Sequence, residues 1–151
     1  SAASDVYKRQ AVDPYQDTVS LSVGPKSLNL TTKVKTVEMT TMLSNADAIS
    51  LHIPNTGKPV LSTAEFDQMK DGVVLINASR GGTVDEDAML DALNTGKVRA
   101  AGLDVFVGEP KPREDILSHA NVSSTPHIGA STVEAQIKIG QELAQQIIDR
   151  L

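Results

Sequence analysis

Four short apolar runs alternate with amphipathic segments along the middle and the end of this chain. The runs occupy residues 48–53, 73–76, 100–105 and 121–124. Such alternation is typical of βαβ units, in which a helix connects two neighbouring parallel strands. The hydrophobic pattern therefore predicts an α/β fold built on a parallel sheet.

Three segments between and after these runs carry helix signals. Residues 62–69 open with Ser-Thr-Ala-Glu, a capping-box pattern, and a turn signal follows at Asp71-Gly72. Residues 85–94 place apolar side chains on one stripe and stop before Gly96, which predicts a glycine cap. Residues 132–151 repeat isoleucine and leucine at helical spacing and predict a final helix.

The first third of the chain is less regular. Residues 18–23 and 28–37 alternate apolar and polar positions around Gly24-Pro25-Lys26-Ser27. This alternation predicts a β-hairpin, or two strands with one solvent-facing side. Residues 1–10 show neither strand nor helix periodicity and are interpreted as an extraneous leader.

Composition narrows the classes of partner. The 151 residues are 40% hydrophobic and 22% charged, as expected for one globular domain. A net charge of -5 argues against a nucleic-acid partner, because phosphates bind basic surfaces. The chain has no cysteine and only three scattered histidines, which predicts neither a disulfide framework nor a metal site. No apolar run approaches the roughly 20 residues of a membrane helix, so we expect no membrane partner and a cytoplasmic location.

Three reactive side chains follow the predicted strands. Arg80, Glu109 and His127 each come shortly after an apolar run, so they are expected at the carboxyl edge of the sheet, where ligands bind. Together they could hold a small acid and move a proton. Taken singly, Arg80 is better explained as a solvated surface residue, and Glu109 is equally well explained as the end of a strand before Pro110. His52, inside an apolar run, is expected to be a satisfied core or edge histidine.

Three spaced motifs carry a family resemblance. They are Asn-Ala-Ser-Arg-Gly-Gly at 77–82, Gly-Leu-Asp-Val-Phe-Val-Gly-Glu-Pro at 102–110 and Thr-Pro-His-Ile-Gly-Ala-Ser-Thr at 125–132. With these motifs the chain resembles the D-isomer-specific 2-hydroxyacid dehydrogenases. The resemblance implies an incomplete doubly wound, Rossmann-type sheet over residues 11–131, without its first strand and glycine-rich turn. It also implies that helix 132–151 leads back toward a substrate domain.

The same resemblance implies a role for each reactive side chain. Arg80 matches the residue that binds the substrate carboxylate, with a planar guanidinium that lysine cannot replace. His127 matches the general acid and base, and Glu109 matches the carboxylate that orients its imidazole.

NAD is the cofactor that the resemblance implies. Asp104 matches a residue that contacts the nicotinamide carboxamide. Asp13, after a short apolar stretch, matches the acidic residue that binds the adenosine ribose and favours NAD over NADP. The other residues expected to line the cofactor are Ala78, Ser79, Arg80, His127, Ile128, Gly129 and Ala130.

The implied activity is that of an oxidoreductase acting on the CH–OH group of a D-2-hydroxy acid. The favoured substrate is 3-phosphoglycerate, in serine biosynthesis; the alternatives are glyoxylate, hydroxypyruvate and D-lactate. An alternative of another class is a non-catalytic NAD-sensing or corepressor-like protein. The full-length protein is expected to be a homo-oligomer. Because the glycine fingerprint is expected before residue 1, the chain alone is expected to show little or no dehydrogenase activity.

Overall fold

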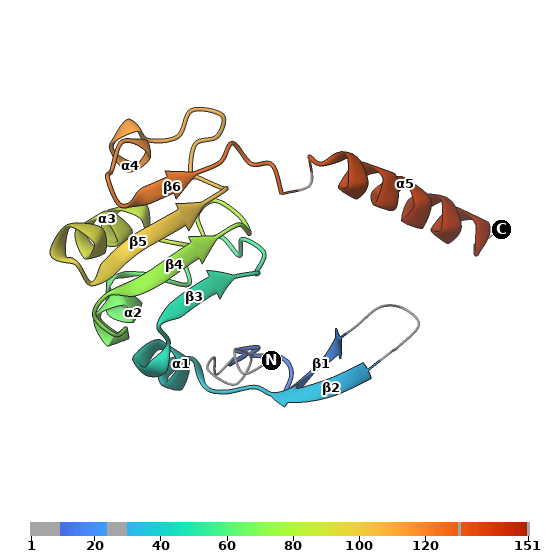
Figure 1. Ribbon diagram of the computed structural model, residues 1–151, viewed down its shortest axis with the longest axis horizontal. Coiled ribbons are helices and arrows are strands. Elements are labelled where there is room, and N and C mark those ends of the chain that lie inside the picture. The colour runs from blue at the N-terminus through green and yellow to red at the C-terminus, as the bar shows by residue number, and fades with distance from the viewer. Residues whose placement is uncertain (1–9, 24–29, 130, 151) are drawn as a thin grey trace, which may run out of the picture.

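Figure 1 shows the computed structural model, which describes residues 10–23, 30–129 and 131–150. An antiparallel pair comes first, formed by β1 (Thr18–Val23) and β2 (Leu30–Lys35). A parallel sheet follows in the order β3-β4-β5-β6, with β3 (Ala48–Leu51), β4 (Val73–Asn77), β5 (Val98–Leu103) and β6 (Val122–Ser124). The helices are α1 (Met39–Asn45), α2 (Thr63–Gln68), α3 (Glu86–Thr95), α4 (Glu114–Leu117) and α5 (Val133–Ile148).

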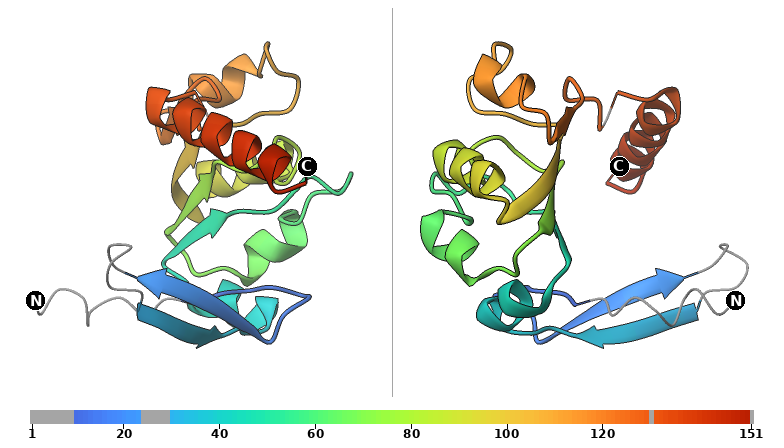
Figure 2. Two further views of the ribbon diagram at one scale, coloured as in Figure 1. Left: turned by 90° about the vertical axis from the view of Figure 1, so that its right-hand side faces the viewer. Right: turned by 60° about the vertical axis from the view of Figure 1, so that its left-hand side comes forward.

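The parallel sheet confirms the fold class expected from the four apolar runs. Its strands run in one direction and are joined by α2, α3 and α4, as in a βαβ arrangement. Side chains alternate between the two faces: Leu75 is completely buried, whereas the adjacent Ile76 is 41% exposed. Helices α1 to α4 lie on the face to which Leu75 points, and the core lies between them and the sheet (Figure 2).

Local sequence signals explain where α2 and α3 begin and end. The Glu65 carboxylate accepts hydrogen bonds from the Ser62 N–H at 2.9 Å and from the Ser62 hydroxyl at 2.5 Å. These contacts, led by the hydroxyl, lower the pKa of Glu65. In α3, the Asp85 side chain accepts from two backbone N–H groups, and Gly96 closes the helix with φ of 80°, which favours glycine. Both predicted helices are confirmed.

The first third of the chain forms the antiparallel pair that its alternating pattern predicted. Thr18 pairs with Lys35 at the open end, and the predicted turn at 24–27 lies outside the described residues. Residues 1–9 of the predicted leader also lie outside them. Ala11 forms an isolated parallel bridge with Thr36. Helix α1 was not predicted, although it buries Leu43 against the core.

Helix α5 confirms the helix predicted at the end of the chain. The Thr132 hydroxyl accepts a hydrogen bond from the Ala135 N–H and caps it. The helix extends away from the sheet and contributes no buried residue (Figure 1). Among the described residues, no helix is both long enough and apolar enough to cross a membrane.

The packing of β4 predicts unequal effects for two neighbouring truncations. Leu75→Ala should lower the free energy of unfolding of this chain by about 2–5 kcal/mol, because it leaves a cavity in the core. Ile76→Ala, on the opposite face of the same strand, should cost less than half as much. Urea unfolding of both variants measures the difference, and equal losses would contradict the one-sided core.

Candidate active site at the carboxyl edge of the sheet

The register of three strands brings the three motifs to the same level. Asn77, Leu103 and Ser124 end their strands as neighbours. The ladder continues one residue further: the Asp104 N–H donates to the Asn77 carbonyl at 2.9 Å, and the Thr125 N–H donates to the Leu103 carbonyl at 2.9 Å. The segments that carry the predicted site residues therefore leave the sheet side by side.

His127 and Glu109 meet directly. The Nδ1 atom of His127 lies 2.7 Å from Oε2 of Glu109, and because a carboxylate only accepts, Nδ1 donates. The second oxygen of Glu109 accepts the Phe106 N–H at 2.8 Å. The imidazole contact, followed by the Phe106 N–H, lowers the pKa of Glu109. The carboxylate is therefore fixed at both oxygens and holds one tautomer of the ring.

Asp104 holds the backbone that presents His127. His127 has φ of 55°, in the left-handed region that a residue with a side chain rarely adopts. The Asp104 carboxylate accepts hydrogen bonds from the Ile128 N–H at 2.9 Å, the Gly129 N–H at 3.0 Å and the Thr125 hydroxyl at 2.5 Å. These bonds on both sides of His127 stabilise its unusual conformation. Strained backbone of this kind gathers at functional sites.

The charge of Asp104 is maintained by the same contacts. Burial alone would raise the pKa of Asp104, but the Thr125 hydroxyl and the Ile128 and Gly129 N–H groups outweigh it and lower the pKa. Asp104 was predicted to contact the nicotinamide carboxamide, and that role stays a prediction. Its part in shaping the His127 segment was not predicted.

A buried polar network shapes the turn that carries Arg80. The Asn77 side chain accepts the Ser79 N–H and hydroxyl, and it donates to the Thr83 hydroxyl at 3.1 Å. Thr83 in turn donates to the Arg80 carbonyl at 2.7 Å. Asn77 and Thr83 are 3% and 1% exposed, so the bonds among Asn77, Ser79 and Thr83 are protected from water. The exposed Arg80 side chain donates through Nη1 to the Ser79 carbonyl at 2.6 Å.

The turn that carries Arg80 lies directly against residues 106–110, which are called the Glu109 loop below. A Cβ atom on Gly81 would fall 2.0 Å from the Phe106 carbonyl oxygen, which only glycine avoids. Asn55 holds the turn from the other side, with its side-chain amide donating to the Gly81 carbonyl at 2.7 Å. The structure thus joins His127 to Glu109 by a hydrogen bond and places the Arg80 turn in contact with the loop of Glu109.

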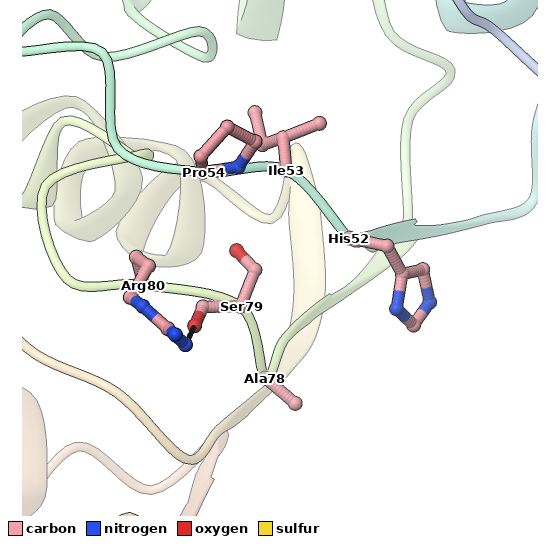
Figure 3. Close-up of a pocket in the computed structure, with 6 residues that line it drawn as sticks. All are labelled: His52, Ile53, Pro54, Ala78, Ser79 and Arg80. Atoms are coloured by element: carbon pink, nitrogen blue, oxygen red, sulfur yellow. Dashed lines mark hydrogen bonds between the residues drawn. The ribbon is translucent and has the colours of Figure 1, made fainter. Parts of the chain in front are cut away.

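An open hollow extends from Arg80 toward the end of β3. It is lined by His52, Ile53, Pro54, Ala78, Ser79 and Arg80 (Figure 3). Residues 52–54 follow the apolar run of β3 as 78–80 follow β4, and this shared position was the signal that could have added them to the predicted site. His52 is an exposed edge histidine, 2.9 Å from the Ser50 hydroxyl, in keeping with its structural interpretation.

Asp13, predicted to bind the adenosine ribose, lies apart from this hollow. Asp13 accepts the Tyr15 N–H at 2.9 Å and the Gln16 side-chain amide at 3.2 Å, beside the antiparallel pair. No hydrogen bond in the described part of the chain joins it to the carboxyl edge of the sheet. Ala130 lies outside the described residues. Within those residues, no group of three or more His, Asp or Glu side chains could hold a metal ion.

The contact at Gly81 predicts a large effect for one added methyl group. Gly81→Ala should lower the free energy of unfolding by about 1–3 kcal/mol, because the turn and the Phe106 carbonyl must move apart. Gly140→Ala adds the same methyl group in open space on α5 and should change it by less than about 1 kcal/mol. Thermal unfolding compares the two; a neutral Gly81→Ala would contradict the close approach.

The Asp104 contacts predict a pH-dependent loss of stability. Asp104→Asn should lower the free energy of unfolding at pH 7 by about 1.5–3 kcal/mol, since an amide cannot accept all the bonds of the carboxylate. Because the pKa of Asp104 in the folded protein lies below its ordinary value of 3.8, the charged carboxylate contributes fully to the free energy of unfolding at pH values above 3.8. The contribution is lost as the pH falls through the folded-state pKa. Urea unfolding from pH 7 to pH 3 should therefore show the difference shrinking, whereas a constant difference would refute a role for the charge.

Curated relatives match most of this chain. D-3-phosphoglycerate dehydrogenase of Archaeoglobus fulgidus is 44% identical over 119 residues, which is 77% of this chain and 23% of that protein. Hydroxypyruvate reductase of Thermotoga maritima is 46% identical over 123 residues, 78% of this chain and 40% of that protein. The chain therefore spans less than half the length of these relatives.

Solved structures match the fold. A glyoxylate reductase from Paecilomyes thermophila superposes with a TM-score of 0.67 at 35% identity, over 72% of this chain and 34% of that one. D-lactate dehydrogenase from Aquifex aeolicus, complexed with NAD and lactic acid, gives a TM-score of 0.65 at 32% identity, over 76% and 40%. The model of the family "D-isomer specific 2-hydroxyacid dehydrogenase, NAD binding domain" matches residues 7–129. This chain belongs to the NAD-binding domain family of the D-isomer specific 2-hydroxyacid dehydrogenases.

Proposed function

We propose that the complete protein carrying this chain oxidises the CH–OH group of a D-2-hydroxy acid with NAD, and that 3-phosphoglycerate is its substrate. The observation that carries the proposal is the 2.7 Å contact between His127 and Glu109 at the carboxyl edge of the sheet. An imidazole oriented by a carboxylate is suited to take a proton from a hydroxyl group and to return it.

The residues around the hollow fit one face of a nicotinamide cofactor. Ile53, Pro54 and Ala78 offer apolar surface, while the Arg80 guanidinium offers polar N–H groups, and all four residues follow the ends of two adjacent parallel strands. The bound cofactor supplies the acceptor for the hydride that leaves the substrate carbon. Ile128 and Gly129 would stand beside it, since Asp104 fixes both of their N–H groups. Asp13 remains our candidate for the adenosine ribose.

His127 would move the proton. Since Nδ1 is engaged by Glu109, Nε2 is the ring nitrogen left for the substrate hydroxyl. During oxidation Nε2 accepts the hydroxyl proton, and the charge that develops on the ring is balanced by the Glu109 carboxylate. During reduction of the corresponding 2-oxo acid, the same nitrogen donates the proton.

Arg80 would hold the substrate carboxylate. Its guanidinium uses Nη1 for the Ser79 carbonyl, which ties the side chain to its own turn. The rest of the planar fork can bind a carboxylate through two parallel hydrogen bonds and so fix the orientation of the acid. The reacting carbon would then lie between Arg80 and His127.

The choice of 3-phosphoglycerate is supported by the relatives. Proteins named D-3-phosphoglycerate dehydrogenase from Archaeoglobus fulgidus, Arabidopsis thaliana and Mycobacterium tuberculosis are 41–46% identical to this chain. Hydroxypyruvate is the second candidate, because the hydroxypyruvate reductase of Thermotoga maritima is equally similar at 46%. We infer a place in serine biosynthesis from the first of these substrates.

Substitutions at the pair test the chemistry in the complete protein. His127→Gln should lower kcat for 3-phosphohydroxypyruvate and NADH by about 100- to 10,000-fold, because the proton donor is lost. Glu109→Gln should give a smaller loss, since the ring keeps a hydrogen-bond partner but not its counter-charge. His119→Gln is the matched control, because His119 accepts the Asn121 N–H outside the site; its rate should stay within about twofold of wild type.

The substrate panel distinguishes the alternatives. Initial rates with 3-phosphohydroxypyruvate, hydroxypyruvate, glyoxylate and pyruvate should favour the phosphorylated acid. Faster reduction of hydroxypyruvate would change the substrate but keep the chemistry. A wild-type protein that binds NADH tightly yet reduces none of the four acids would overturn the enzymatic proposal in favour of an NAD sensor.

A further inference from the structure

The position of the Glu109 carboxylate depends on the loop that carries it. One oxygen bonds the imidazole of His127, and the other bonds the Phe106 N–H within the same loop. The second bond orients the carboxylate relative to the loop but does not fix the loop relative to the sheet. Val107, between these residues, is 50% exposed and adds little packing. Phe106 is packed in the core, so it is the stretch from Val107 to Glu109 that needs a further anchor.

The first two residues of α3 supply that anchor. Glu86 accepts the Val107 N–H through Oε1 at 2.8 Å, across 21 residues of sequence. The next residue, Asp87, accepts from Nη1 of Arg113 at 2.6 Å, just after the loop. Arg113 is itself held by a second carboxylate, that of Asp115. The first turn of α3 thus holds the chain at Val107, before Glu109, and at Arg113, after it.

Helix α3 is itself held in place by packing against the core. It buries Ala88, Met89, Ala92 and Leu93, more side chains than any other helix of the described residues. The turn that carries Arg80 enters α3 directly, through the N-cap Asp85. The start of α3 is therefore attached both to the turn that carries Arg80 and to the Glu109 loop.

We propose that Glu86 is a positioning residue of the active site, which holds the Val107 N–H so that Glu109 meets His127 in reacting geometry. This inference rests on the proposed function for its kinetic consequence, but not for its structural one. Of the two anchors, Glu86 lies closer to the site, because Val107 is only two residues from Glu109. A misplacement of a reacting group by about 1 Å can cost about 100-fold in rate.

Three variants of the complete protein test the role. Glu86→Ala removes the acceptor. Glu86→Gln keeps an oxygen at the same reach and should rescue the contact with Val107. Asp91→Ala removes a carboxylate from the exposed side of the same helix, where the structure gives it no side-chain hydrogen bond, and is the matched control. Thermal unfolding establishes that all three variants are folded.

The kinetic readout separates positioning from binding. Glu86→Ala should lower kcat by about 10- to 100-fold while the KM for NADH stays within about twofold, because the cofactor hollow does not include Glu86. Glu86→Gln should recover at least half of the lost rate, and Asp91→Ala should match wild type. A Glu86→Ala enzyme with wild-type kcat would overturn the kinetic part of the proposal.

A second readout does not need turnover. Carbon-13 NMR of the Glu109 carboxylate should show its pKa rising toward the ordinary value in Glu86→Ala, as the contact with His127 loosens. Hydrogen exchange at the Val107 amide should accelerate in the same variant and not in Asp91→Ala. If wild type reduces none of the acids, the proposed function fails while these two measurements still decide the role of Glu86. Unchanged values of both would overturn it.

Discussion

The register of the parallel ladder decides whether this site can exist. Parallel strands whose ends are staggered would release their following segments at different heights, but here Asn77, Leu103 and Ser124 are neighbours. Backbone bonds from Asp104 and Thr125 extend the alignment beyond the strands. Three strand ends that lie more than 20 positions apart in the sequence are thus brought together by backbone hydrogen bonds, which do not depend on side-chain identity.

Beyond the strands, hydrogen bonds from buried or half-buried polar side chains hold the chain segments in place, as the backbone ladder does within the sheet. Hydrogen bonds of Asn77 and Thr83 hold the Arg80 turn, and hydrogen bonds of Asp104 hold the segment that carries His127. Each satisfies backbone groups that leave the sheet without partners, and no described buried side-chain nitrogen or oxygen lacks a hydrogen bond. Such fully satisfied networks stabilise one conformation, because any alternative leaves a polar group unpaired in the protein interior. The reactive side chains themselves can then remain exposed to substrate.

The sequence predicted those features that depend on neighbouring residues. The capping box at Ser62 and the glycine cap at Gly96 located two helices, and apolar runs located the four parallel strands. The convergence of Glu109 and His127 was predictable because both follow such runs. The roles of Glu86 and Asn55 were not, because their bonds to Val107 and Gly81 span 21 and 26 residues and arise only when two loops are folded against each other. A lone carboxylate or amide in a sequence does not indicate which backbone N–H or carbonyl it will meet.

His127 and Glu109, the hydrogen-bonded pair of the site, are therefore each held in place by another carboxylate. Asp104 holds the backbone just after His127, and Glu86 holds the backbone just before Glu109. In both cases a carboxylate accepts a main-chain N–H, which constrains the loop without adding bulk near the substrate. The supports differ in burial: Asp104 is 9% exposed, whereas Glu86 is half-buried at the helix start. Water competes more strongly for the bond at Glu86, so the Glu109 side of the pair is the one whose geometry a single substitution can loosen without unfolding the sheet.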